Sequence, residues 1–307
     1  MKCGFAERYI RLYYSSPVDT ISQQKIKMGT CAWTYDDWRG AFYPPHLPQN
    51  QWLEFYARYF PSVEVDSTFY HAPSAKVVGQ WAERTPEDFR FSCKMPKEIT
   101  HGLRLRDCEE KLTEFLTVME PLRPKLGCIL IQLPPTFVPK QDEKALKSFF
   151  ALLPPSFRFA VEFRHADWHL PRIVHYLEDH GICWAWSDTS ALHEQNRAAF
   201  EPLPQTTNFL YIRLLGDLRT KYLADGSRKH RYGSLMWPRD SSLESWAIKI
   251  HKHLPESENI YLYSGNHFEG MASLTCQRIA RLLNIPMELP AAAEDNPQPS
   301  GTQMTLL

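Results

Sequence analysis

The sequence alternates between short apolar runs and amphipathic segments, and this alternation repeats eight times. The runs are rich in β-branched and aromatic residues, which favour strands. We expect strands at 26–33, 62–68, 89–95, 126–133, 158–165, 183–188, 208–215 and 259–264. We expect helices within 50–60, 74–84, 107–120, 141–152, 170–180, 241–253 and 269–283. Alternation at this spacing is typical of βαβ units and a parallel sheet.

Eight repeats favour closure of the sheet into a (β/α)8 TIM-type barrel, which commonly spans about 250 residues as one domain. The alternative is a doubly wound open sheet, whose nucleotide-binding members carry a glycine-rich motif after a strand. No GxGxxG or GxxxxGK[ST] pattern follows an expected strand. The sequence therefore predicts an α/β barrel over 26–285. We expect 1–25 to be a poorly ordered extension and 286–307, which has few large apolar residues, to be a disordered tail.

The composition limits the partners. The 35 Lys and Arg residues balance the 35 Asp and Glu residues, so nucleic acid, which attracts strongly basic domains, is a possible but disfavoured partner. No window approaches the roughly 18 consecutive apolar residues of a membrane span, and the first residues do not resemble a secretory signal. Seven cysteines without a CxxC pair favour reduced thiols. We expect a cytoplasmic protein without a membrane partner.

Side chains alternate between the two faces of a strand, so the sequence indicates which residues face the barrel interior. Six polar side chains fall on that face near the carboxyl ends of strands: Lys94, Gln132, Glu162, Arg164, Asp188 and Arg213. Active sites of such barrels lie at this end, so we interpret the six as a site. Glu64 and Arg90 lie nearer the strand starts or middles. For these two, buried ion pairs that serve only the fold are an equal or stronger alternative.

A lysine and two arginines in a neutral protein indicate an anionic ligand, with phosphate as the first candidate. The basic loop at 219–233 after the seventh strand supports phosphate. The expected ligand-binding residues are Arg164, Arg213, Gln132, Tyr70, Trp168 and Asn266. The expected catalytic residues are Glu162 as general acid or base, Asp188 as its alternative, Lys94, and His101 as a proton shuttle.

A metal site is the alternative for the same end of the barrel. His71, His165 and His267 follow strands and could bind a metal together with Glu162 and Asp188. No HExxH or similar compact spacing is present, and nearby Arg and Lys side chains would repel a divalent ion. We therefore expect neither a metal nor another cofactor.

Seven motifs, in chain order, resemble the YecE-like family, also called domain of unknown function 72. They are GTCAWTYDDWRGAFYP at 29–44, VEVDSTFY at 63–70, FRFSCKMPKEITH at 89–101, IQLPP at 131–135, AVEFRHADW at 160–168, YIRLLGD at 211–217 and YSGNHFEGMA at 263–272. The resemblance implies a (β/α)8 barrel similar to endonuclease IV-like barrels, which is an analogy of fold. Three positions depart from the family pattern: Asp66 stands where Asn is common, Leu215 where His is common, and Ser264-Gly265 where Phe-Asn is common.

Three functions remain open from the sequence. The residues favour a metal-independent enzyme, a hydrolase or an isomerase or lyase, that acts on a phosphorylated or otherwise anionic small molecule. The first alternative is a nucleic-acid processing hydrolase of the endonuclease IV kind. The second is a ligand-binding protein without catalysis.

Overall fold

The computed structural model describes residues 24–189, 203–216 and 231–291. Its strands coincide closely with the expected runs. They are β1 (Ile26–Thr30), β2 (Ser62–Val65), β3 (Arg90–Lys94), β4 (Leu126–Gln132), β5 (Phe159–Glu162), β6 (Ile182–Trp184), β7 (Trp186–Thr189), β8 (Phe209–Gly216) and β9 (Asn259–Ser264). The loop at 219–233 and the segments 1–25 and 286–307 lie wholly or largely outside the described residues.

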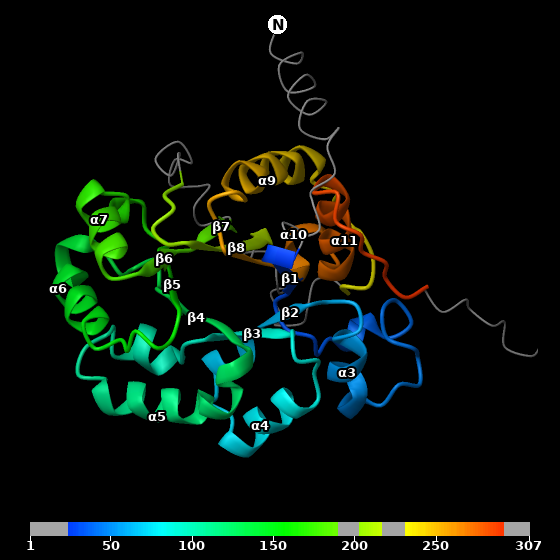
Figure 1. The fold of residues 1–307 in the computed structure, drawn as a ribbon, viewed down its shortest axis with the longest axis horizontal. Helices are drawn as coiled ribbons and strands as arrows, with labels where there is room; N and C mark the ends of the chain where they lie inside the picture. The colour runs from blue at the N-terminus through cyan, green and yellow to red at the C-terminus, as the bar shows by residue number, and fades with distance from the viewer. Residues whose placement is uncertain (1–23, 190–202, 217–230, 292–307) are drawn as a thin grey trace, which may run out of the picture.

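The strands form two parallel sheets with helices packed around them (Figure 1). The four-stranded sheet has the order β1-β9-β8-β7, and the five-stranded sheet has the order β2-β3-β4-β5-β6. Every pairing within them is parallel. The predicted α/β class with parallel strands is therefore confirmed.

The segment 183–188, predicted as one strand, contains the boundary between the sheets. β6 pairs with β5, whereas β7 pairs with β8. Thr206 explains the break, because its hydroxyl accepts a hydrogen bond from the Trp184 amide at 2.8 Å and donates to the Ile182 carbonyl at 2.7 Å. A side chain thus takes the place that a neighbouring strand would occupy beside β6. The spacing of apolar residues in the sequence cannot reveal that a side chain takes the place of a strand here.

The helices follow the predicted segments. They are α3 (Trp52–Tyr56), α4 (Ala75–Glu83), α5 (Glu109–Met119), α6 (Pro139–Phe150), α7 (Pro171–Asp179), α9 (Asp240–His253), α10 (Asn266–Glu269) and α11 (Ala272–Leu282). Proline begins α6 and α7, where its missing amide costs no helical hydrogen bond. The segment 269–283, predicted as one helix, is interrupted at Gly270, whose φ of 109° only glycine adopts readily. Across the described residues, no helix is both long and apolar enough to cross a membrane.

The apolar core confirms the alternation of faces in β2. Val63 and Val65 are buried in the main core, to which Phe115 of α5 also belongs. Glu64, between them, contacts Tyr211 and Arg213 of β8 in the other sheet. The inner faces of the two sheets therefore meet, and the charged residues of these faces are brought together there.

Three contacts join the sheets beside β1 and β2. Cys31 forms an isolated parallel bridge with Glu64, and the Ala32 amide donates to the Glu64 carbonyl at 2.7 Å. The Ser62 hydroxyl donates to the Lys27 carbonyl at 2.9 Å. Ala32 has a φ of 75°, a conformation that strains a residue with a Cβ atom and that is found most often near functional sites.

Candidate functional site

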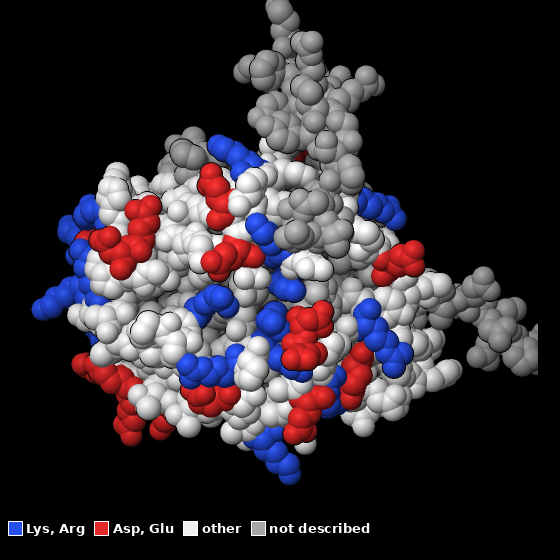
Figure 2. Space-filling view, viewed as in Figure 1, with Lys and Arg blue, Asp and Glu red and all other residues white. Residues whose placement is uncertain are grey.

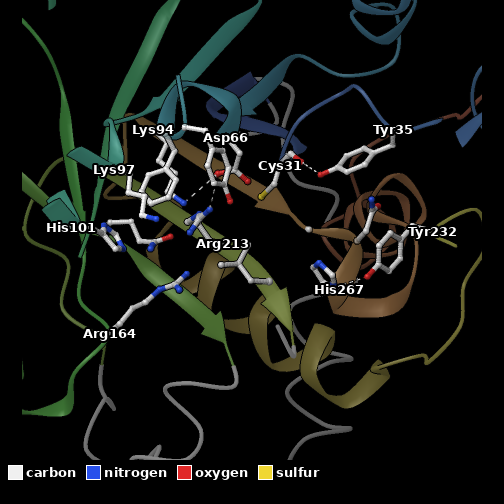
Figure 3. Close-up of a pocket in the computed structure, with 16 residues that line it drawn as sticks. Cys31, Tyr35, Asp66, Lys94, Lys97, His101, Arg164, Arg213, Tyr232 and His267 are labelled. Carbon is white, nitrogen blue, oxygen red and sulfur yellow. Dashed lines mark hydrogen bonds and ion pairs between the residues drawn. The ribbon is translucent and has the colours of Figure 1, made fainter. Parts of the chain in front are cut away.

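A cavity of about 470 Å³ opens at the carboxyl ends of the strands. Seven strands or the residues just after them contribute to its lining: Cys31, Asp66, Lys94, Gln132, Arg164, Arg213 and Gly265. In parallel sheets these ends are where ligands bind, because the loops that leave them converge there. Figure 3 shows Lys94, Asp66 and Arg213 pointing toward one another in this cavity, with Tyr232 and His267 on another wall.

Arg213 is the centre of a buried ion-pair network below the cavity. Its guanidinium donates from Nε and Nη2 to the Glu64 carboxylate, at 2.9 and 2.6 Å, and from Nη1 to Glu162 at 2.5 Å. Tyr211 donates at 2.6 Å to Glu64 Oε2, the oxygen that also accepts from Arg213 Nε. Both glutamates are fully buried, and Arg213 is 2% exposed. The structure therefore gives Glu64 a structural partner, Arg213, from the opposite sheet.

Glu162 is bound by two cations. Arg164 donates from Nε to its second oxygen at 2.6 Å, while Arg213 holds the first. Burial alone would raise the pKa of Glu162, but the two guanidinium groups lower it from 4.5 to about 2. Glu162 does not line the cavity. A carboxylate with this pKa is a weak base near neutral pH and a poor general acid, so the geometry fits a residue that positions Arg164 and Arg213.

Lys94 lies at the end of β3 with its ammonium at the cavity. The Nζ atom is 3.7 Å from Asp66 Oδ1 and 4.0 Å from the centre of the Phe69 ring. Asp66 and Phe69 both belong to the turn η3 (Asp66–Phe69), which directly follows β2. Burial lowers the pKa of Lys94, Asp66 opposes this shift, and Arg213 and Arg164 add to it. A lysine of lowered pKa loses its proton more readily than a surface lysine, and the neutral amine is a nucleophile.

His101 lies in a π-helical turn, η4 (Glu98–Gly102), after β3. Turns of this kind occur frequently at functional sites. Burial lowers the pKa of His101 to about 4, and the nearby charges of Lys94 and Arg164 contribute. Its Nδ1 is 2.9 Å from the Thr100 hydroxyl. The imidazole is therefore neutral near pH 7, and its pKa is lowered in part by the nearby positive charges of the cavity.

Neutral polar groups line the rest of the cavity. The Tyr232 hydroxyl is 2.8 Å from His267 Nδ1, and the Tyr35 hydroxyl donates to the Cys31 carbonyl. Asn266 and Gln132, both predicted as ligand-binding residues, line the cavity as buried side chains.

The structure places two predicted site residues away from the cavity. Asp188 accepts hydrogen bonds from Trp246 at 2.9 Å and from Ser242 at 3.0 Å, both on α9. Trp168 is fully buried, donates to the Phe137 carbonyl at 2.7 Å and stacks on the Phe137 ring. Alternation runs unbroken through 183–188. Cys183 and Ala185 belong to the inner cluster, whereas Trp184 and Trp186 belong to the outer core, so Asp188 falls on the outer face toward α9. Tyr70 lines the cavity and is 66% exposed.

Several lining residues are outside the predicted site, among them Asp66, Lys97, Tyr35 and Tyr232. Lys97 follows β3 within the FRFSCKMPKEITH motif, three residues after Lys94, and that motif was a signal that could have identified it. Tyr35 and Tyr232 come from long loops, where no strand alternation shows the direction of a side chain.

Among the described residues, one group of three metal-ligating side chains converges: Cys31, Glu64 and Asp66, with ligand atoms within 4.8 Å of one another. Glu64 is already bound by Arg213, which also lies 3.5 Å from Asp66. A guanidinium thus occupies the position of a cation between the two carboxylates. The histidine cluster considered from the sequence does not form among these residues, because His165 instead contacts Asp167 on the protein surface.

Lys and Arg side chains are interspersed with Asp and Glu over the face in Figure 2, in agreement with the net charge of zero. Any attraction of an anion must therefore arise locally. Four cations line the cavity, namely Lys94, Lys97, Arg164 and Arg213, together with one carboxylate, Asp66.

Comparisons with curated proteins identify two relatives. A stretch of 113 residues is 47% identical to UPF0759 protein YecE of Escherichia coli strain K12. This match spans 37% of the chain and 41% of that relative, so the chain covers less than half of its length in the match. UPF0759 protein YunF of Bacillus subtilis strain 168 is 24% identical over 277 residues, which cover 85% of the chain and 95% of the relative.

Solved structures of similar fold come from the same family. A DUF72 family protein from Thermotoga maritima superposes with a TM-score of 0.69 and 26% identity, covering 84% of this chain and 98% of that one. Another from Enterococcus faecalis has a TM-score of 0.68 at 22% identity, covering 86% and 97%, and supports the fold alone. The family model described as protein of unknown function DUF72 matches residues 27–301. The chain therefore belongs to the DUF72 family, as its seven motifs predict.

Proposed function

We propose that the cavity binds a small anionic molecule, in the first place a phosphorylated one, and that the protein is a metal-independent enzyme that acts on it. The observation that carries this proposal is the set of four cations around one carboxylate at the cavity surface. Burial is the main cause of the lowered pKa of His101, and the positive charges of Lys94, Arg164 and Lys97 add to it, which supports a positive potential there. Such a potential favours phosphate or carboxylate groups.

The proposal includes a fold in which the two sheets form one closed (β/α)8 barrel. Only Ala185 separates β6 from β7, and its amide donates to the Val161 carbonyl of β5 at 2.9 Å. If β6 and β7 are one interrupted strand, the strands number eight, and the contacts between β1 and β2 close the other junction. The cavity then occupies the end of the barrel at which active sites of this fold lie.

The residues divide into binding and catalytic roles under this proposal. Arg164 and the exposed Lys97 contact the anionic group, and Glu162 orients the two guanidinium groups from below. Lys94 transfers protons or attacks the substrate, and Asp66, 3.7 Å away, exchanges protons with it through one water. A metal-dependent nucleic-acid hydrolase fits less well, because Arg213 fills the space between the carboxylates that would bind the metal.

Calorimetric titration with inorganic phosphate and with ribose 5-phosphate tests the binding claim. Lys94→Met and Lys97→Met each remove one cation from the cavity, whereas Lys76→Met removes an exposed lysine of α4 that does not line it. A charged hydrogen bond contributes about 1.5–3 kcal/mol, which corresponds to roughly 10–100-fold in affinity. We expect losses of this size for the two cavity variants and none for Lys76→Met. Equal affinities in all four proteins would overturn the anion site.

Native mass spectrometry of the purified protein, followed by turnover of the molecule that co-purifies, tests the catalytic claim. Under the proposal an anionic metabolite accompanies the wild type, is lost from Lys97→Met and is converted by the wild type. A bound metabolite that stays unchanged on prolonged incubation would indicate a binding protein instead.

A further inference from the structure

We propose that Lys94 forms a Schiff base with the carbonyl group of its ligand, which makes the substrate class anionic aldehydes or ketones. This inference rests on the proposed anion site, because the cations around Lys94 are what would hold the anionic end of such a molecule. It goes further by naming the reacting atom, Lys94 Nζ, and the group it attacks.

The surroundings of Lys94 Nζ make its ammonium easier to deprotonate than that of a solvated lysine. The side chain is 10% exposed, and its nearest carboxylate oxygen is 3.7 Å away, beyond hydrogen-bond length. Within the described part of the chain, no hydrogen bond from Nζ is present, and the Phe69 ring covers one side at 4.0 Å. A buried ammonium without hydrogen bonds is costly, so the uncharged form is favoured relative to a solvated lysine.

The charged groups around Lys94 come from several elements. Asp66 approaches from η3, Arg213 from β8, and Arg164 with Glu162 from β5 and the residues after it. His101, from η4, is neutral near pH 7 because its pKa is about 4. Burial together with Arg213 and Arg164 lowers the pKa of Lys94 against the opposing effect of the carboxylates. Desolvation beside a second cation is the combination that activates Schiff-base lysines.

Two other lysines with lowered pKa values show what a structural lysine looks like in this fold. Lys125 donates from Nζ to the Ala82 and Thr85 carbonyls, each at 2.6 Å, so its protons are held by the backbone. Lys27 is half-buried beside Arg90 and Asp88. Neither lines the cavity, whereas Lys94 does. Lys94 alone of the three combines a lowered pKa with access to a ligand.

The reaction balances without any further reagent. Asp66 takes a proton from the Lys94 ammonium, and the neutral Nζ attacks the carbonyl carbon to form a C–N bond. The carbonyl oxygen becomes a hydroxyl group after proton transfer from nitrogen. Asp66 returns its proton to this hydroxyl, which leaves as water when the C=N bond forms. The protonated imine keeps the positive charge beside Asp66, where the ammonium stood.

Borohydride trapping tests the inference directly. Glyceraldehyde 3-phosphate is incubated with the protein in the presence of sodium cyanoborohydride, and the labelled residue is located by peptide mass spectrometry. We expect a single stable adduct on Lys94, formed with an apparent pKa below that of surface lysines. Lys94→Arg, which keeps the charge but removes the amine, should abolish this adduct. Lys76→Arg, which alters an exposed lysine of α4 that does not line the cavity, should retain it.

The same experiment separates failure of the Schiff base from failure of the anion site. Inorganic phosphate should slow labelling of Lys94, and glyceraldehyde without phosphate should label it at least 10-fold more slowly. If phosphate binds in calorimetry but Lys94 is labelled no faster than surface lysines, the Schiff base is refuted and the anion site stands. If Lys94 is labelled selectively but equally by both aldehydes, the amine chemistry stands and the anion site is refuted.

Discussion

Replacing Arg213 with methionine removes the cation that joins the inner faces of the two sheets. Methionine fills much of the same volume, so the main change is electrostatic. The variant leaves the Glu64 carboxylate with only the Tyr211 hydroxyl and leaves Glu162 with only Arg164 among the bonds described above. Both carboxylates remain fully buried. The substitution therefore tests whether this network stabilises the fold as well as the cavity.

The expected loss of stability follows from the burial of the network. Breaking one partner of a buried ion pair costs about 3–5 kcal/mol, because the remaining charge stays desolvated. Two carboxylates lose a partner here, while Tyr211 and Arg164 each offset part of that loss. We therefore expect about 3–5 kcal/mol, a large part of the roughly 5–15 kcal/mol that stabilises a typical domain.

Urea denaturation at pH 7 measures this loss, with Arg123→Met as the control. Arg123 pairs with Glu120 on the surface, where both side chains are more than 40% exposed, and such pairs contribute about 0–1 kcal/mol. A double variant, Arg213→Met with Glu64→Leu, should recover part of the stability by removing one stranded carboxylate. A loss below about 1 kcal/mol for Arg213→Met, near the top of the range for a surface pair, would refute the reasoning.

Three further outcomes follow from the structure. Asp188→Ala leaves the Trp246 indole without its acceptor and should cost about 1–3 kcal/mol in urea denaturation, while phosphate affinity stays unchanged. Gly29→Ala should fold poorly or not at all on circular dichroism, because its Cβ would lie 1.9 Å from the Ser62 carbonyl oxygen. Glu162 has a folded pKa of about 2, below its ordinary 4.5, so its stabilising contribution is complete above pH 4.5 and should be lost in denaturation series as the pH falls toward 2.

The strands and most helices follow from the sequence because burial imposes a strict period on each element. In β2, the alternation of Val63, Glu64 and Val65 alone placed the glutamate on the inner face. The same reasoning brought Lys94, Arg164, Arg213 and Gln132 together at the cavity, where the structure has them.

The remaining features depend on contacts that a linear pattern does not contain. The hydroxyl of Thr206 separates β6 from β7 through a contact between residues 22 positions apart in the chain. Glu162 faces inward as expected, yet its pKa depends on two arginines, each of which binds one of its carboxylate oxygens. Alternation predicts the face of the sheet on which a side chain lies. It predicts neither how far that side chain is buried below the cavity surface nor which residues it bonds to.

The titration of His101 by NMR, without and with saturating sulfate, tests the anion site most directly. Sulfate stays doubly charged throughout the titration, so only the protein changes protonation. The account predicts a pKa of about 4 without sulfate, because His101 is desolvated and faces cations. With sulfate bound, the pKa should rise markedly, while the exposed His175 of α7 should not respond. A His101 pKa near 6.5 without sulfate, or one that sulfate leaves unchanged, would contradict the proposed site.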